Sequence, residues 1–133
     1  MRRRTSSALI AVLSLLLSGL AALSAPAAHA ATQCTVTYTK SDWGSGFTAS
    51  VTIKNLGDAL SSWTLTYAYT GNQTLTNGWS GKWSQSGKNI TVTNASWNGG
   101  IATGGSVSIG ANFSYSGTNT APAAFTLNGA ACS

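Results

Sequence analysis

The sequence holds very few of the side chains that carry out catalysis. It has no glutamate and a single histidine, His29, and its only carboxylate side chains are Asp42 and Asp58. Glycoside hydrolysis ordinarily needs two carboxyl groups facing each other across the scissile bond, and a nucleophilic triad needs a base such as histidine. His29 lies in a segment assigned below to a leader. The composition therefore argues against an enzyme.

Arginine is confined to the first four residues, which belong to a predicted secretory leader. An apolar stretch follows from Leu9 to Leu23, and a small-x-small cleavage pattern ends at Ala30. The stretch is too short for a convincing membrane span. We therefore expect a leader over residues 1–30, a mature domain over residues 31–133, and a secreted, extracellular protein with no membrane partner.

Positive charge is also scarce once the leader is removed. The mature chain keeps four lysines and two aspartates, a formal net charge of 4 − 2 = +2. The lysines are scattered singly and form no basic stripe, which makes nucleic acid a poor candidate partner. We expect an uncharged partner.

Cysteine occurs only twice, as Cys34 and Cys132 near the two ends of the mature chain. In a secreted protein such a pair is ordinarily a structural disulfide, and two cysteines without a histidine are too few for a metal site. We predict a Cys34–Cys132 disulfide, no metal and no cofactor, in a monomer of one small domain.

Alternation with period two is present along nearly the whole mature chain and predicts half-buried strands. Apolar residues alternate with Thr, Ser or Lys in several runs, which are separated by Gly- and Asn-rich turns. No segment reads as an amphipathic helix. We predict seven to nine short strands in an all-β, two-sheet antiparallel β-sandwich. The core faces are predicted to carry Phe47, Ala49, Val51, Ile53, Trp63, Leu65, Tyr67, Tyr69, Ile90, Val92, Ile109, Ala111, Phe113, Phe125 and Leu127.

Three tryptophans belong to none of these alternating faces. Trp43, Trp79 and Trp97 each lie among glycine, serine and asparagine, neighbours that cannot bury an indole, so we expect all three at the surface. Trp63 is in phase with Leu65 and belongs to the core. Trp83 lies in a strand-like run where either face is open.

A row of exposed indoles suits a neutral sugar polymer. A pyranose ring presents a flat face of C–H bonds that an aromatic ring can bury, while its hydroxyl groups point sideways to polar side chains. The polar candidates near the three tryptophans are Ser41, Ser50, Asn77, Asn98, Ser108 and Asn112, of which Ser50, Ser108 and Asn112 are otherwise plain outward-facing strand residues.

These motifs together resemble the family 2 carbohydrate-binding modules of secreted bacterial cellulases and xylanases. The resemblance covers Cys34 to Cys132. Besides the terminal cysteines it rests on Trp43-x-x-Gly46-Phe47, Val51 to Asn55, Ser62 to Tyr67, Asn77-Gly78-Trp79, Trp83 to Gly87, Asn94 to Gly99 and Phe125 to Gly129.

The resemblance implies a β-sandwich that binds crystalline cellulose through three surface tryptophans, here Trp43, Trp79 and Trp97. The xylan-binding subgroup typically presents two, with another ring orientation, and chitin binding also occurs in the family. The family's polar contacts would fall on Ser41, Ser50, Asn77, Ser108 and Asn112. Such modules usually hang by a linker from a catalytic domain, so the chain is expected to be either a separate secreted binder or part of a truncated gene.

A protein-binding sandwich such as an adhesin subunit is the alternative from another class. Protein interfaces are usually enriched in Tyr and Arg as well as Trp. The mature chain has no arginine, and its expected exposed aromatics are mostly tryptophan. A sugar surface is therefore favoured over a protein one.

Overall fold

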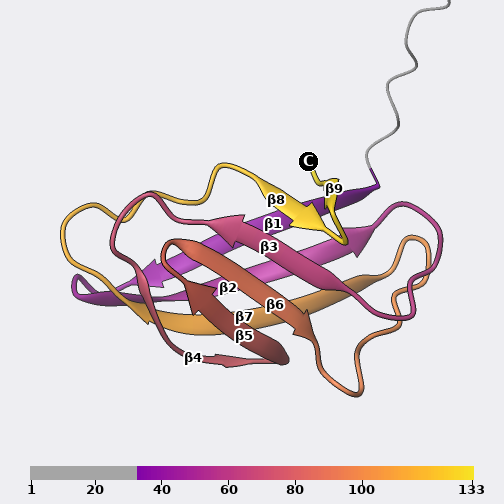
Figure 1. Cartoon of the computed structure of the whole chain (residues 1–133), viewed down its shortest axis with the longest axis horizontal. Coiled ribbons are helices and arrows are strands. Elements are labelled where there is room, and N and C mark those ends of the chain that lie inside the picture. Colours follow the sequence, from indigo (N-terminus) through magenta and orange to yellow (C-terminus); the bar gives the residue numbers. More distant parts are fainter. Residues whose placement is uncertain (1–32) are drawn as a thin grey trace, which may run out of the picture. The chain divides into compact units, whose positions relative to one another are not determined.

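The computed structural model describes residues 33–133, so the predicted leader lies outside the described residues. Within this range the chain forms strands and no α-helix (Figure 1). No helix of the described part has the length and apolarity needed to cross a membrane. The strands are β1 (Cys34–Asp42), β2 (Gly46–Asn55), β3 (Thr64–Ala68), β4 (Thr74–Trp79), β5 (Gly81–Ser86), β6 (Asn89–Asn94), β7 (Ser106–Ser114), β8 (Phe125–Leu127) and β9 (Ala130–Ala131).

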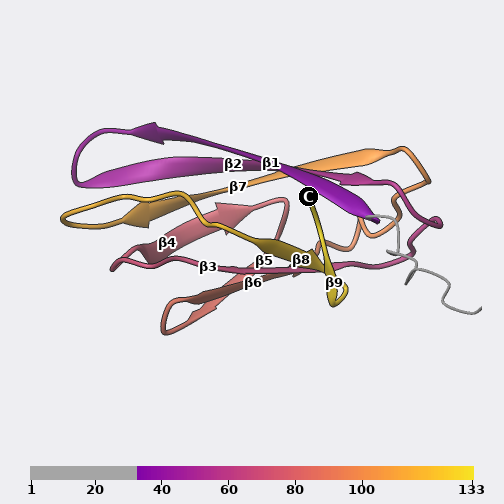
Figure 2. The ribbon, with the colours of Figure 1, turned by 90° about the horizontal axis from the view of Figure 1, so that it is seen from above.

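The strands form two antiparallel sheets that lie in separate layers (Figure 2). One sheet has the order β1-β2-β7-β4, and the other has the order β5-β6-β3-β8-β9. Strands β4 and β5 follow each other in the sequence but belong to different sheets, and each is an edge strand of its sheet. The predicted two-sheet β-sandwich is confirmed.

The core lies between the sheets and is filled by the faces that the alternation predicts. In β2, Phe47, Val51 and Ile53 are fully buried, whereas Ser50 and Lys54 are exposed. Burying a side chain of this size contributes about 1.5–3 kcal/mol, so the two-residue period fixes which face of β2 turns inward.

Trp63, just before β3, is the largest fully buried side chain, at 1% exposure. Its indole nitrogen donates a hydrogen bond of 2.8 Å to the backbone oxygen of Asn98. Because the only polar atom of the side chain finds a partner, the indole is buried without leaving a donor unpaired. The prediction that Trp63 belongs to the core is confirmed.

Three tyrosine hydroxyls meet inside the sandwich. The hydroxyl of Tyr69 lies 3.1 Å from that of Tyr38 and 3.2 Å from that of Tyr67. Burial raises the pKa of all three phenols above the ordinary value, because the charged phenolate would be poorly solvated there. These polar groups therefore pair with each other in their neutral form.

The two cysteines are joined as predicted. The Cys34–Cys132 disulfide links the first residue of β1, in one sheet, to the residue that follows β9, in the other. Its loop spans 98 residues of sequence, and closing a loop of that size contributes up to about 4.7 kcal/mol on the loop-entropy model. The last residue, Ser133, also exchanges backbone hydrogen bonds with β1, at Cys34 and Val36.

Candidate functional site

The side of the β1-β2-β7-β4 sheet that faces away from the core carries most of the predicted site residues. We call it the outer face. Its residues follow from strand register, since those opposite one another on neighbouring strands point to the same side. One row across the sheet consists of Ser41, Thr48, Asn112 and Asn77, and the next consists of Thr39, Ser50, Gly110 and Trp79.

Trp79, the last residue of β4, lies flat on the outer face and is 42% exposed. It is paired with Gly110 of β7. A Cβ on Gly110 would lie only 2.5–2.6 Å from three atoms of the Trp79 indole, so the ring rests directly on the glycine backbone. The opposite face of the indole is left to solvent.

Trp43 is 59% exposed and lies in the tight turn between β1 and β2. Its backbone nitrogen donates to the oxygen of Gly46 at 3.0 Å, which closes the turn. A Cβ on Gly46 would lie 2.9 Å from Cζ2 of the Trp43 indole, so this ring, too, covers a glycine. Gly46 pairs with Ser114, four residues along β7 from Gly110, which separates the two glycines by roughly 13 Å along the strands.

The turn that carries Trp43 is anchored by the carboxylate of Asp42. This group accepts hydrogen bonds from the Gly44 backbone at 2.7 Å, the Tyr115 hydroxyl at 2.8 Å and the Asn119 amide at 2.8 Å. Hydrogen bonds from Asn119, Gly44 and Tyr115 lower the pKa of Asp42 below its ordinary value. The charged carboxylate therefore ties the β1–β2 turn to the segment after β7.

Trp97 lies in the loop between β6 and β7 and is 72% exposed, the most of the three. The next residue, Asn98, holds the loop: its Oδ1 accepts from the Ala95 backbone at 2.7 Å, and its Nδ2 donates to the Ser80 backbone oxygen at 2.7 Å. Ser80 directly follows Trp79. The loop that presents Trp97 is thus tied to the end of the strand that presents Trp79.

Trp83 belongs to the inner side, which decides the alternative that the sequence left open. It is partly buried against the core, with its ring 6.2 Å from that of Phe113 in an edge-to-face arrangement. A Cβ on Gly78 would lie 2.3 Å from the Trp83 ring, and Nε1 of Trp83 donates to the Trp79 backbone oxygen at 3.2 Å. Trp83 therefore packs against the core side of β4.

A chain of hydrogen-bonded side chains crosses the outer face between the two indoles. Thr48 donates to Oδ1 of Asn112 at 2.6 Å, and Nδ2 of Asn112 donates to Oδ1 of Asn77 at 3.1 Å. Within residues 33–133, no protein group accepts from Nδ2 of Asn77. Because Asn77 accepts the last hydrogen bond of this series, its amide nitrogen remains an exposed donor.

The three serines of the predicted site also lie on the outer face and are exposed. Ser50 is directly opposite Gly110, beside the Trp79 ring, and Ser41 is opposite Thr48. The hydroxyl of Ser108 lies 3.2 Å from that of Thr52. Five of the six predicted polar residues, and two of the three predicted indoles, therefore share one face of one sheet.

Comparison with known proteins assigns the family. The family model described as a cellulose binding domain matches residues 34–132. The chain belongs to the family 2 carbohydrate-binding modules. It is therefore a polysaccharide-binding module, and the predicted resemblance is confirmed.

The relatives of this module come from enzymes that act on different polysaccharides. Exoglucanase A of Cellulomonas fimi is 55% identical over 100 residues, which are 74% of this chain and 12% of that enzyme. The chitin-binding domain of Chi18aC from Streptomyces coelicolor is 42% identical, with a TM-score of 0.63 over 77% of this chain and 96% of that domain. The internal xylan-binding domain of Cellulomonas fimi xylanase D is 28% identical, with a TM-score of 0.53 over 72% and 97%.

One polar candidate has another place in the module than the sequence indicated. Asn98 is only 7% exposed, and its amide is used to hold the Trp97 loop, so it is no surface contact for a sugar. Thr48 was missed, although it lies on the outer face and donates to Asn112. The two-residue period of β2, which places Thr48 on the same side as Ser50, was the signal that identifies it.

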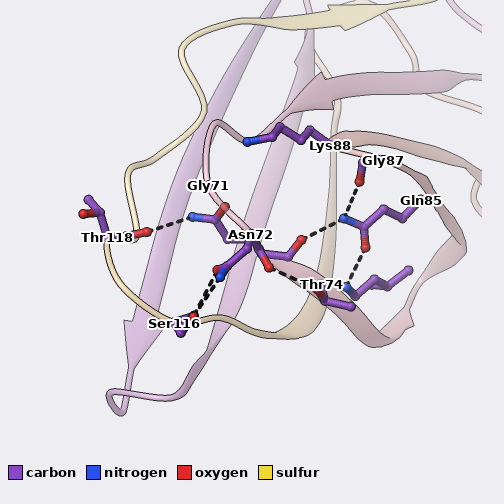
Figure 3. Close-up of a pocket in the computed structure, with 10 residues that line it drawn as sticks. Gly71, Asn72, Thr74, Gln85, Gly87, Lys88, Ser116 and Thr118 are labelled. Atoms are coloured by element: carbon purple, nitrogen blue, oxygen red, sulfur yellow. Dashed lines mark hydrogen bonds between the residues drawn. The ribbon is translucent and has the colours of Figure 1, made fainter.

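A polar cleft lies at the open edge of the module, between β4 and β5 (Figure 3). Gln85 spans it: Oε1 accepts from the Leu75 backbone at 2.7 Å, and Nε2 donates to the Gln73 backbone oxygen at 2.8 Å. Asn72 exchanges two hydrogen bonds with Ser116 nearby. The polar side chains of the cleft thus bond mostly to backbone groups of the neighbouring segments, and Gln85 joins the edges of the two sheets.

Proposed function

We propose that this protein is a secreted, non-catalytic binder of crystalline cellulose that stacks Trp43, Trp79 and Trp97 on the polymer surface. The observation that carries the proposal is the exposure of these three indoles, at 59%, 42% and 72%, while Trp63 is buried and Trp83 is turned inward. Leaving large apolar rings in water gains nothing in stability. A ligand that covers them gives them a role.

The arrangement of the outer face supports stacking on a flat surface. Trp43 and Trp79 each lie against a glycine of the sheet, which leaves the other ring face to solvent. The sheet holds the rings before the ligand arrives, so little side-chain entropy is lost on binding. Asn77, Asn112, Ser41, Ser50 and Ser108 are the polar groups that we expect to meet sugar hydroxyls beside the rings.

Cellulose is the first candidate polymer because the family is described as cellulose binding and Exoglucanase A is 55% identical. Chitin is the second candidate, supported by the likeness to the chitin-binding domain of Chi18aC. Xylan has weaker support, since the xylan-binding domain is 28% identical.

We infer that the chain binds polysaccharide without cleaving it. The carboxylates within residues 33–133 are Asp42 and Asp58. Asp42 is occupied by three hydrogen-bond donors in the Trp43 turn, and Asp58 lies in the turn after β2. Secretion follows from the predicted leader, and a monomer is expected because no interface is needed to complete the outer face.

The proposal is tested by mixing the purified protein with microcrystalline cellulose, chitin or insoluble xylan and measuring how much protein is left in solution. We expect Trp43→Ala, Trp79→Ala and Trp97→Ala each to weaken cellulose binding by about tenfold, since each removes one stacked ring. Leu56→Ala is the matched control, because Leu56, at 42%, is as exposed as Trp79 but lies in the turn after β2.

Salt dependence separates stacking from charge attraction. Residues 33–133 carry six charged side chains, and the lysines among them are scattered singly along the sequence. Binding should therefore change little between low and high salt. Retention of all three tryptophan variants on cellulose, or a steep loss of binding with salt, would contradict the proposal.

A further inference from the structure

Gly110 has no conformational reason to be glycine. The glycines with positive φ in the described residues are Gly44, Gly87, Gly104, Gly117 and Gly129, so the backbone of Gly110 is open to any residue. Glycine in the middle of a strand is unfavourable because it packs no side chain and loses more entropy on folding. Its presence at the centre of β7 therefore calls for a steric explanation.

The indole of Trp79 supplies that explanation. All three of the nearest atoms to a Cβ built on Gly110 belong to this ring: Cζ2 at 2.5 Å and Cε2 and Nε1 at 2.6 Å. Real Cβ atoms do not approach other heavy atoms so closely. A methyl group on Gly110 would therefore displace the ring.

The Trp79 ring cannot avoid this clash by a shift of β4, the strand that carries it. On the core side of β4, the Trp83 ring fills the space that a Cβ on Gly78 would need, and Nε1 of Trp83 donates to the Trp79 backbone oxygen. The backbone of β4 is thus held by Trp83 on one side and by the pairing with β7 on the other. Relief of the clash has to come from rotation of the indole itself.

We propose that Gly110 is a positioning residue for polysaccharide binding, because the lack of a side chain there lets the Trp79 indole lie flat on the outer face. The inference rests on the proposed function, in which Trp79 stacks on the polymer. A side chain at Gly110 would tilt the ring and take its face out of the plane of the sheet. Gly46 underlies Trp43 in the same way, but a Cβ there would also lie 2.7 Å from the backbone oxygen of Phe113, which makes Gly110 the cleaner position to test.

The test is a double-mutant cycle with Gly110→Ala, Trp79→Ala and the double variant, each measured on microcrystalline cellulose. Gly110→Ala is expected to weaken binding by about tenfold, as much as the loss of the ring, and to have no effect when Trp79 is already alanine. The indole N–H resonance of Trp79, identified in NMR spectra by its absence from Trp79→Ala, is expected to shift in Gly110→Ala. Gly100→Ala is the control, since its Cβ would meet only the Leu60 oxygen, at 3.8 Å.

Each outcome of the cycle decides the matter. Wild-type binding by Gly110→Ala, or an equal loss in both backgrounds, overturns the inference. If Gly110→Ala fails to fold while the double variant folds, the recovery of folding on removal of the ring supports the clash between a side chain at Gly110 and Trp79. If Trp79→Ala binds like the wild type, the proposed function fails for that ring, and an unmoved indole resonance in Gly110→Ala would then overturn the inference separately.

Discussion

Replacing Gln85 with alanine should destabilise the protein through the open edge of the sandwich. The Gln85 side chain is the link between β5 and the start of β4: it accepts from the Leu75 backbone, and it donates to the backbone oxygens of Gln73 and, at 3.0 Å, Gly87. Strands β4 and β5 belong to different sheets, so no ladder of backbone hydrogen bonds joins them. Alanine removes all three bonds at once.

The size of the effect follows from the groups left without a partner. Leaving one buried donor or acceptor unpaired costs about 1–3 kcal/mol. The Leu75 nitrogen and the Gln73 oxygen are only partly buried, so water replaces some of the loss, and we expect a total of about 2 kcal/mol. At about 4–8 °C for each kcal/mol in a domain of this size, the melting temperature should fall by about 8–16 °C.

Thermal and urea unfolding of Gln85→Ala measure this cost. Ser86→Ala is the matched control, because Ser86 is the exposed neighbour on β5, and its loss should change stability by less than about 0.5 kcal/mol. If Gln85→Ala melts within a degree or two of the wild type, the cleft between β4 and β5 is not a structural seam, and its polar groups are free for another role.

Three further predictions concern the core and the Trp43 turn. Trp63→Ala should lower the free energy of unfolding by roughly 3–5 kcal/mol in urea titrations, because it empties a buried site and leaves the Asn98 oxygen unpaired. Stability should fall as the pH rises above about 10, because Tyr67 and Tyr69 have raised pKa values in the folded state and the unfolded chain loses those protons first. Melting temperatures followed by circular dichroism at pH 8 to 12 would contradict this if they stayed constant. Asp42→Ala should weaken cellulose binding by about two- to fivefold with little change in melting temperature, because it frees the Trp43 turn; an unchanged affinity would show that the carboxylate does not position Trp43.

The core and the sheet architecture could be predicted because one signal dominates both. Phe47, Val51 and Ile53 alternate with polar residues, and a shift by one residue would turn the whole set to solvent. The same period placed Trp63 in the core. The pairing of Cys34 with Cys132 followed from their number alone.

The surroundings of Trp79 were harder to interpret from the sequence. In the sequence, the glycine next to Trp79 counts only as a neighbour too small to bury the indole, but Gly78 lies inside β4, and Gly110, far away in the sequence, lies in β7 under the indole. A glycine that makes room for a ring from another strand looks the same in a sequence as one that makes a turn. The prediction that Trp79 is exposed is confirmed, but the glycine on which its ring lies, Gly110, could not be identified from the sequence.

The positions of Trp83 and Asn98 depend on contacts that no local pattern reports. Trp83 turns inward because Gly78 leaves space beneath β4. Asn98 is buried because its amide joins the Trp97 loop to Ser80, 18 residues earlier in the chain. Both depend on strands that meet only in the folded protein.

The central claim is that the three exposed indoles bind the polymer, and the most direct test replaces all of them together. The purified wild-type protein and a Trp43→Ala, Trp79→Ala, Trp97→Ala variant would be mixed with microcrystalline cellulose, and the protein left in solution would be measured. Melting temperatures would confirm that both are folded. The account predicts that the wild type is retained and the variant stays in solution. Equal retention of a folded variant, or no retention of the wild type on cellulose, chitin or xylan, would contradict it and favour a protein partner for this surface.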